Sequence, residues 1–228
     1  MGIVIRVSEL RYQYSDSGPV LRGINYTQSS GESVALLGTN GSGKTTFALH
    51  LNGILQGQGE IEIDGIRVES HTLEAVRRKV GFVLQSAENQ LFLPTVLEDV
   101  MFGLLNQGVA VEEARQRAMQ MIESLNLEAY AGRNPFHLSA GEKRRAALGG
   151  VLLMEPEVLI LDEPTTFLDP PGIRSLSQML NRQSMAKIII THDSRFAIET
   201  TTRAVFFEKG QIVAEGPTRE IIDRFGWL

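Results

Sequence analysis

The segment Gly38–Thr45 has the residue types and spacing of a phosphate-binding loop. It fits the pattern G-x-x-x-x-G-K-[ST] and follows the apolar run Val34–Leu37. Glycines let a backbone wrap closely around an anion, and a helix starting at the end of the loop adds partial positive charge beside it. We therefore expect Lys44 to reach the β- and γ-phosphates of a nucleotide. The alternative is a glycine-rich turn beside a solvated lysine.

The other loop residues would complete a site for ATP and Mg²⁺. The Thr45 hydroxyl is expected to ligate Mg²⁺, and the Thr46 hydroxyl to bind a phosphate oxygen. A helix is expected from Lys44 to Asn52. The remaining nucleotide-binding positions predicted in the loop are Gly38, Asn40, Gly41, Ser42 and Gly43.

A second candidate site is the pair of acids that ends the aliphatic segment Val158–Leu161. A strand of a parallel sheet delivers its last residues to the carboxyl edge, where ligands of open α/β folds bind. There Asp162 can hold Mg²⁺ through a water, and Glu163 can accept a proton from an attacking water. A strand followed by an ordinary charged turn is the alternative.

The composition limits the function classes. The 228 residues are 43% hydrophobic and 21% charged, with a net charge of -5 and no cysteine, which excludes disulfides and thiolate chemistry. The charge balance disfavours a nucleic-acid binder. Met1–Leu10 does not have the pattern of a signal peptide, and the apolar runs are too short for a membrane span. If the protein drives transport, other chains must form the pore.

Hydrophobic patterning predicts a parallel sheet covered by helices on both faces. The middle third instead has helical periodicity, which indicates a mostly helical insert over about residues 86–135. Asp64-Gly65 marks a hairpin. Strands are expected at Ile3–Val7, Leu21–Tyr26, Val34–Leu37, Gly59–Ile63, Arg67–Val68, Val80–Leu84, Val158–Leu161, Lys187–Thr191 and Ala204–Phe207, and further helices at Gly172–Asn181 and Ser194–Thr200.

Four further segments have the order and approximate spacing of ABC-transporter motifs. Leu138–Glu142 resembles the signature usually written L-S-G-G-Q, and Phe167–Pro170 resembles the D-loop. Thr191–Asp193 resembles the segment with the switch histidine, and Gln85 lies where the Q-loop glutamine would be. Essentially the whole chain resembles an ABC nucleotide-binding domain. This implies an α/β P-loop NTPase core over residues 1–228, with a parallel sheet, an N-terminal antiparallel β subdomain and a helical insert.

The resemblance also implies roles for residues outside the phosphate loop. Two such domains pair head to tail, so Ser139 and the Gly141 amide would contact a γ-phosphate held by the opposite protomer. Asp169 would cross the interface. His192 would hold the γ-phosphate and attacking water, and Gln85 would sense Mg²⁺ and water while linking the site to the insert. Without the resemblance, Ser139 is an ordinary helix cap and His192 an ordinary surface histidine.

The resemblance further implies that an aromatic side chain before the second strand stacks on adenine; we expect Tyr14, with Tyr12 as the alternative. Three residues depart from the family pattern. Ala140 and Glu142 replace the usual Gly and Gln, so Ala140 should have negative φ and Glu142 should point away from phosphate or be paired. Phe167 stands where many relatives have a small residue.

The segments Gln85–Phe92 and Met154–Thr165 are similar to energy-coupling-factor ATPases, which serve cobalt and vitamin importers. This resemblance implies an ATPase that is peripheral on the cytoplasmic face of the cell membrane. Its partners would be integral membrane subunits and a second ATPase protomer, identical or different. Many members of that group carry an added C-terminal dimerisation domain. The sequence ends at Leu228 without one, so a permanent dimer is not expected.

Two other functions remain open from sequence. A soluble ABC ATPase acting on nucleic acid or the ribosome usually has a long coiled coil or two linked domains, and neither is present here. A nucleotide-binding regulator with little hydrolysis would not need Glu163 and His192, both of which are present.

Overall fold

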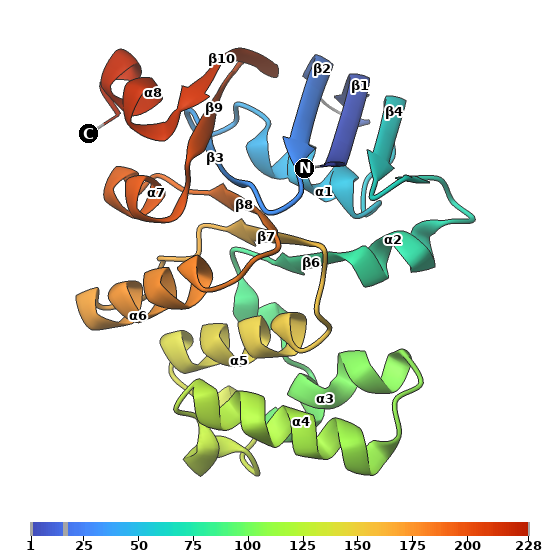
Figure 1. Cartoon of the computed structure of the whole chain (residues 1–228), viewed down its shortest axis with the longest axis vertical. Helices are drawn as coiled ribbons and strands as arrows, with labels where there is room; N and C mark the ends of the chain where they lie inside the picture. The colour runs from blue at the N-terminus through green and yellow to red at the C-terminus, as the bar shows by residue number, and fades with distance from the viewer. Residues whose placement is uncertain (1, 16–17, 228) are drawn as a thin grey trace.

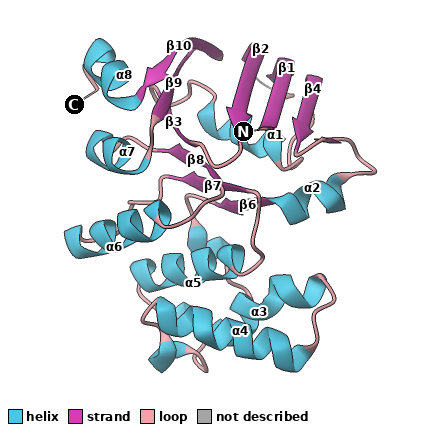
Figure 2. Ribbon diagram, viewed as in Figure 1, coloured by secondary structure: helices cyan, strands magenta, loops and turns pink. Residues whose placement is uncertain are grey.

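The computed structural model describes residues 2–15 and 18–227, and builds them around two β-sheets (Figures 1 and 2). The larger sheet consists of β3 (Ser33–Leu37), β6 (Val80–Val83), β7 (Val158–Asp162), β8 (Ala186–Ile190), β9 (Arg203–Glu208) and β10 (Gln211–Pro217). Their order is β10-β9-β3-β8-β7-β6. All pairs are parallel except β9 with β10, so the predicted parallel sheet is confirmed.

The smaller sheet contains the N-terminal strands and is antiparallel. It consists of β1 (Ile3–Gln13), β2 (Pro19–Ser29), β4 (Gln58–Ile63) and β5 (Ile66–Arg67), in the order β2-β1-β4-β5. The predicted hairpin at Asp64-Gly65 joins β4 to β5, with φ of +47° and +77° at the two turn residues. The N-terminal antiparallel β subdomain is therefore confirmed.

The helices surround the larger sheet and form the insert. They are α1 (Lys44–Leu51), α2 (Leu73–Lys79), α3 (Val96–Asn106), α4 (Val111–Ser124), α5 (Ala140–Leu152), α6 (Pro170–Asn181), α7 (Ser194–Thr200) and α8 (Thr218–Phe225), with 3₁₀ turns η1 (Ala87–Gln90), η2 (Glu128–Tyr130) and η3 (Pro135–His137). Figure 1 shows α3 and α4 farthest from the smaller sheet, with α5 between them and the larger sheet. This is the helical insert expected over residues 86–135.

Both faces of the larger sheet are buried, and alternate residues of each strand serve different cores. Along β7, Val158 and Ile160 join a core shared with α1 and the smaller sheet. Leu159 and Leu161 join a core shared with α3, α4, α5 and α6. Side chains of a strand alternate between its faces, so this division follows directly from the continuous aliphatic run.

Side-chain caps decide where several helices begin. Thr95 accepts a hydrogen bond from the Glu98 amide at 3.2 Å and starts α3. Asp169 accepts one from the Gly172 amide at 2.8 Å. Asp169 is followed by two prolines, and proline suits the first turn of a helix because its missing N–H would be unpaired there. For that reason α6 begins at Pro170, and the predicted start at Gly172 was two residues late.

The sequence reasoning missed α2, β10 and α8, although two of them carried signals. Lys209 and Gly210 both have positive φ, +47° and +79°, and form the two-residue turn of a hairpin between β9 and β10. Pro217 before α8 and Gly226 after it are helix start and stop residues. In α2 only Val76 is buried, so that helix had almost no periodicity to detect.

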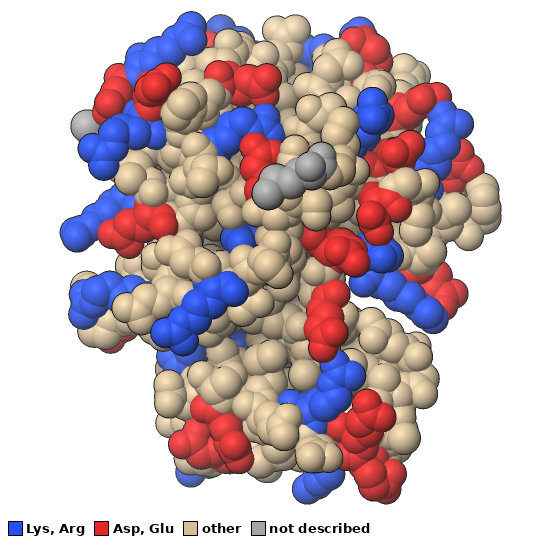
Figure 3. Space-filling model, in the orientation of Figure 1, with Lys and Arg blue, Asp and Glu red and all other residues tan. Residues whose placement is uncertain are grey.

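The visible surface in Figure 3 carries basic and acidic side chains side by side over most elements. That face therefore presents no broad field of one sign to a polyanion. Within the described part of the chain, no helix has the length and apolar character needed to cross a membrane.

Gly210 joins the two sheets at the phosphate loop, and we predict that Gly210→Ala destabilises the protein. Its amide donates to the Ser42 carbonyl at 3.0 Å, and its carbonyl accepts from the Arg22 amide at 2.9 Å. An added Cβ would lie 2.2 Å from the carbonyl oxygen of Val20, at a φ of +79°. Left-handed alanine costs about 1–2 kcal/mol, and the clash should add about 1–3 kcal/mol.

The matched control is Gly65→Ala, because Gly65 has a φ of +77° but no atom within 4 Å of its would-be Cβ. Urea unfolding of both variants separates backbone strain from the clash. Gly210→Ala should lose at least about 1 kcal/mol more free energy of unfolding than Gly65→Ala. Equal losses would show that the junction does not constrain the fold.

Candidate active site

A cleft of about 560 Å³ opens at the carboxyl edge of the larger sheet, between the phosphate loop and the ends of β7 and β8. Most of the predicted site residues line it: Tyr14, Asn40, Gly41, Ser42, Gly43, Lys44, Thr45, Thr46, Gln85, Asp162, Glu163 and His192. Gly38, Ser139, Gly141 and Asp169 are not among the described residues that line it. Motifs that are far apart in the sequence therefore meet in one site. Ser139, Gly141 and Asp169, which are expected to act on the site of a second protomer, are not part of its described lining.

Glycine is required where the loop begins and where it enters α1. Gly38 has a φ of +132°, and a Cβ there would lie 2.1 Å from the Phe207 carbonyl oxygen. Gly43 has a φ of +106° at the N-cap of α1. Within the loop, the Lys44 ammonium donates to the carbonyls of Gly38 at 2.6 Å and Thr39 at 3.0 Å. The lysine therefore ties the end of the loop to its beginning and keeps the loop curved.

Thr45 and Asp162 connect the two halves of the cleft. The Thr45 hydroxyl donates to a carboxylate oxygen of Asp162 at 2.9 Å, although the residues are 117 positions apart. Asp162 is buried. A hydroxyl oxygen and a carboxylate oxygen thus lie side by side at the loop. Hard oxygen ligands of this kind are the donors that Mg²⁺ prefers.

Glu163 is held by its backbone in a conformation that is unusual for its type. Its φ is +47°, while its amide donates to the Ile190 carbonyl at 2.8 Å across the sheet edge. One carboxylate oxygen lies 3.3 Å from His192 Nε2, and the other accepts from the His192 amide at 3.4 Å. A strained backbone that orients a carboxylate into a cleft is typical of a functional site.

Burial shifts the pKa of four ionisable groups in the cleft towards the neutral form. It raises the pKa of Asp162 and Glu163, against the lowering effects of hydrogen bonds and of Lys44 and Arg144. It lowers the pKa of Lys44, which the two carboxylates partly oppose. Burial, and then Lys44, lower the pKa of His192, so the imidazole is neutral at pH 7. The mutual attraction of Lys44 and the two acids opposes these shifts.

Arg144 is a site residue that the sequence reasoning did not identify. It is buried in α5, and its guanidinium donates to the carbonyl oxygens of Glu163 and of Gln85, the latter at 2.6 Å. It therefore joins the backbone of the Q-loop segment to that of the glutamate. The available signal was the pair Arg144-Arg145 before the apolar residues of a helix, since a buried guanidinium must find acceptors.

The two candidate adenine-stacking tyrosines lie in different environments. Tyr14 is 41% exposed, lines the cleft, and its hydroxyl lies 3.3 Å from the Thr46 hydroxyl. Tyr12 packs edge-on against His50, with ring centroids 4.7 Å apart, at the margin of the core under the smaller sheet. The placement favours Tyr14, whose role in stacking remains a prediction.

Ser139 caps α5 and forms a reciprocal capping box with Glu142. The Ser139 hydroxyl accepts from the Glu142 amide at 3.3 Å, and the Glu142 carboxylate accepts from the Ser139 amide and hydroxyl, each at 2.7 Å. Hydrogen bonds from Tyr130 and then Ser139 lower the pKa of Glu142. The departure at Glu142 is therefore paired, as expected. Ala140 lies in the first turn of α5, where its φ is helical.

Phe167 is the departure with the largest structural consequence. It has a φ of +64°, which is unfavourable for a bulky side chain, and it is 71% exposed. Its carbonyl oxygen faces Gly141, where a Cβ would lie 3.9 Å away. The signature and D-loop segments therefore lie next to each other on the surface.

Comparison with protein families decides the assignment. Residues 21–166, which include the phosphate loop, Gln85, the signature and the paired acids, match the sequence model of the ABC transporter family. The chain belongs to the ABC transporter family. As an ATPase of this family it binds and hydrolyses ATP.

Individual ABC relatives cover nearly the whole chain. An energy-coupling factor transporter ATP-binding protein, EcfA, from Methanothermobacter thermautotrophicus is 43% identical and matches 96% of this chain and 72% of its own length. The EcfA protein of Methanosphaera stadtmanae is 41% identical and matches 97% and 82%. These similarities confirm the likeness to energy-coupling-factor ATPases.

Solved structures confirm the ABC ATPase fold. The chain cbiO1 from Clostridium perfringens, part of the ABC transporter complex cbiONQ, has a TM-score of 0.85 and 35% identity, covering 98% of this chain and 92% of that one. A dimeric ATP-binding cassette in a post-hydrolysis state, bound to ADP and Pi, has a TM-score of 0.84 and 27% identity, covering 94% and 99%.

The raised pKa of Glu163 predicts a pH-dependent stability change in the Glu163→Gln variant. A folded-state pKa above the ordinary value of 4.5 means that the folded state binds this proton more tightly than the unfolded state does. The stability that the carboxyl contributes is therefore lost as the pH rises from about 4.5 through the raised pKa. Without nucleotide, Glu163→Gln should melt at a higher temperature than the wild type at pH 7, and the difference should shrink towards pH 4.

Thermal melts across that pH range, monitored by circular dichroism, measure this difference. Glu123→Gln, at an exposed carboxylate on α4, is the control and should melt like the wild type throughout. A Glu163→Gln variant that melts below the wild type at pH 7 would mean that the ionised carboxylate stabilises the fold.

Proposed function

We propose that this ABC ATPase is the motor subunit of an energy-coupling-factor-like importer of a small solute, such as a metal ion or a vitamin. The cleft would convert ATP binding and hydrolysis into movement of an integral membrane partner, at the cytoplasmic face of the membrane. The names of the EcfA and cbiO1 relatives support the transporter class. The structural observation that carries the proposal is an apolar groove that adjoins the Q-loop segment.

In the proposed reaction Glu163 accepts a proton from the attacking water. His192, neutral and 3.3 Å from that carboxylate, orients the water and γ-phosphate. Lys44 and the loop amides balance charge on the β- and γ-phosphates. Gln85 acts near Mg²⁺ and the attacking water. Arg144 binds the carbonyls of both Gln85 and Glu163, and so fixes the two segments relative to each other.

The residues present fit Mg²⁺. Thr45 and Asp162 supply two oxygens, and no group of three or more His, Cys, Asp or Glu side chains within the described ranges is placed to hold a metal. Mg²⁺ commonly takes one or two protein oxygens and fills its other positions with water and phosphate oxygens. When bound, it would neutralise charge on the phosphates. Gln85 lines the same cleft, in keeping with its proposed role near the ion.

We also propose that each ATP is shared between two protomers, identical or different. Ser139 and Asp169 are exposed and do not line the cleft of their own chain as described. The first amides of α5, including that of Gly141, lack partners within the helix and suit an anion. The dimeric cassette with ADP and Pi is a precedent among the structural relatives. In such a dimer, Glu142 must give up its hold on the Ser139 hydroxyl to a γ-phosphate.

We predict that Glu163→Gln retains Mg-ATP binding, loses about 10²–10⁴-fold in turnover and accumulates as an ATP-bound dimer. Steady-state phosphate release measures the turnover, and light scattering measures the mass at rising ATP concentration. Adding Ser139→Arg to this variant should leave ATP binding intact but keep the protein monomeric. Near-normal phosphate release would refute Glu163 as the base, and full wild-type hydrolysis by a lasting monomer would refute the shared site.

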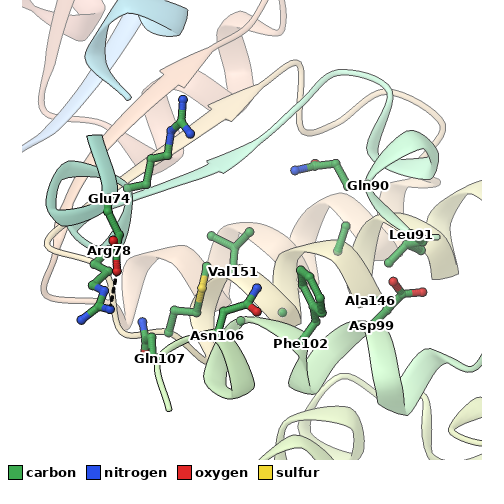
Figure 4. A pocket seen from close by; sticks show the side chains of 15 residues that line it. Glu74, Arg78, Gln90, Leu91, Asp99, Phe102, Asn106, Gln107, Ala146 and Val151 are labelled. Carbon is green, nitrogen blue, oxygen red and sulfur yellow. Dashed lines mark hydrogen bonds and ion pairs between the residues drawn. The ribbon is translucent and has the colours of Figure 1, made fainter. Parts of the chain in front are cut away.

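The groove that we propose for the membrane partner lies between α3, α5 and the region of α2 (Figure 4), and has a volume of about 450 Å³. Its floor is apolar, with Leu91, Phe102 and Val151 facing it from different segments. Next to it Phe92, 61% exposed, packs edge-on against Phe102 with centroids 5.2 Å apart. An amphipathic helix of a partner would bury these side chains.

Asp99 gives the part of the groove beside α3 a charge preference, whereas Arg77 and Arg78 line the part beside α2. One of its carboxylate oxygens accepts from the amides of Phe92 and Leu93 at 3.0 and 3.1 Å. The other is buried and has no hydrogen-bond partner among the described residues. A buried carboxylate oxygen without a partner is costly, so a basic side chain on the docking helix would satisfy it. Gln90, bonded to Leu84 and Phe82, ties this region to β6 next to Gln85.

Cross-linking tests the docking proposal, and the absence of cysteine from the chain makes single-cysteine variants unambiguous. Asn106→Cys at the groove and Asn89→Cys near its entrance should each cross-link to an integral membrane protein in native membranes. Gln211→Cys on β10 is the control and should not. Cross-links from the groove positions that stay within the ATPase itself would refute docking there.

Asp99→Asn refines the same test, because the amide keeps an acceptor for Phe92 and Leu93 but removes the charge. ATPase activity of the isolated protein should stay unchanged. Affinity for the membrane partner should fall by about 2 kcal/mol or more, the usual cost of removing one member of a buried charge pair. Unchanged membrane association would mean that no cation faces Asp99.

A further inference from the structure

The end of α8 turns a tryptophan back towards the active site. Gly226 has a φ of +58°, its amide donates to the Asp223 carbonyl at 3.3 Å, and the next amide, of Trp227, donates to the Ile222 carbonyl at 3.0 Å. This pair of bonds is the Schellman closure, in which a left-handed residue reverses the chain and places the following side chain against the protein. Figure 1 shows α8 beside β9 and β10.

The Trp227 ring is fixed by an aromatic cluster on β9. It packs edge-on against Phe206, with centroids 5.4 Å apart and planes at 87°. Phe206 is itself buried and stacks on Phe225, with centroids 3.8 Å apart and planes at 6°. Edge-to-face and offset-stacked contacts of this kind add about 0.5–1.5 kcal/mol beyond the area that they bury. The indole therefore sits on a rigid base.

From this base the indole reaches His192. The two ring centroids are 5.8 Å apart, with planes inclined at 31°. Towards the cleft, the same imidazole has its Nε2 atom 3.3 Å from the Glu163 carboxylate. The His192 side chain is 41% exposed, so few other neighbours limit its rotation. The imidazole is thus held between a carboxylate in the cleft and an aromatic ring outside it.

We propose that Trp227 is a positioning residue for hydrolysis: its indole holds the His192 imidazole in the orientation that faces Glu163 and the γ-phosphate. The inference rests on the proposed role of His192. The contact limits the imidazole to fewer orientations before ATP binds, which lowers the entropy lost when the reacting groups are aligned. It also makes the packing of α8 part of the hydrolytic site, although α8 contributes no residue to the cleft as described.

Steady-state kinetics of three variants test the proposal. Trp227→Ala should lower kcat about 5- to 20-fold with KM for ATP within about twofold of wild type, since small misplacements of a reacting group cost up to about 10²-fold. Trp227→Phe keeps an aromatic ring and should recover at least half of the activity. Phe225→Ala is the matched control: it removes a partner of Phe206 from the same helix end, yet Phe225 makes no ring contact with His192 among the described residues.

Thermal melts of the same variants separate positioning from stability. Both alanine variants should melt at lower temperature than wild type, but Trp227→Ala should lose clearly more kcat than Phe225→Ala, which keeps the indole beside His192. Wild-type kcat in Trp227→Ala, or an equal loss of kcat in Phe225→Ala, would overturn the proposal. His192→Ala belongs in the same series: wild-type turnover there would refute the role of His192 itself, which distinguishes that failure from a failure of Trp227 alone.

Fluorescence provides a readout that loss of packing would not reproduce, because Trp227 is the chain's single tryptophan. In the Glu163→Gln background, addition of Mg-ATP should change the emission as His192 engages the γ-phosphate. Adding His192→Ala should abolish that change while ATP binding persists. An unchanged emission on saturation with ATP, or a full response without the imidazole, would show that the two rings are not coupled.

Discussion

The site depends on one constraint: oppositely charged groups are kept close together where water is largely excluded. Burial shifts the pKa of Lys44, Asp162 and Glu163 towards the neutral form. Lys44 opposes the shift of the two acids, and the acids oppose the shift of Lys44. Removing Lys44 would leave two buried acids without that cation, whereas removing Glu163 would leave Lys44 and Asp162 as an opposed pair. The parallel sheet meets this requirement because its strands end at one edge, where segments distant in sequence converge.

This constraint also explains why backbone carbonyls are the hydrogen-bond partners of the buried cations in the site. Lys44 binds loop carbonyls, and Arg144 binds the carbonyls of Gln85 and Glu163. A cation that is satisfied by fixed carbonyls is already oriented, and needs little rearrangement when phosphate charge arrives. Helix α5 supplies Arg144 from one turn and caps itself with Ser139 at its start. The same helix therefore carries Ser139, which is proposed to contact the ATP of the opposite protomer, and Arg144, which binds the backbone of the site in its own chain.

Much of this could be predicted from sequence, because the residues concerned act locally. A glycine-rich loop has a length and conformation set by its own residues, and an aliphatic strand that ends in acids places them at a sheet edge whatever lies around it. Arg144, Trp227 and the groove beside Asp99 could not be predicted in this way. Their partners are backbone carbonyls, an imidazole and an unpaired oxygen brought close only by tertiary packing, and no spacing in the sequence encodes those distances. The late start assigned to α6 was different, since Asp169 and the prolines after it were legible and were not used.

The groove and the aromatic cluster are connected to the same glutamate by different contacts, and this arrangement has a physical consequence. Leu91 and Phe92 directly follow the Q-loop segment, whose Gln85 carbonyl is bonded to Arg144 and through it to Glu163. Trp227 approaches from α8 and contacts His192, which lies beside the carboxylate of that glutamate. A shift of the groove would therefore reach Glu163 through backbone hydrogen bonds, whereas a shift of α8 would reach it through ring packing. Hydrogen bonds are short and directional, so a shift of the groove would move the backbone of the glutamate itself, whereas a shift of α8 would change the orientation of the imidazole beside its carboxylate.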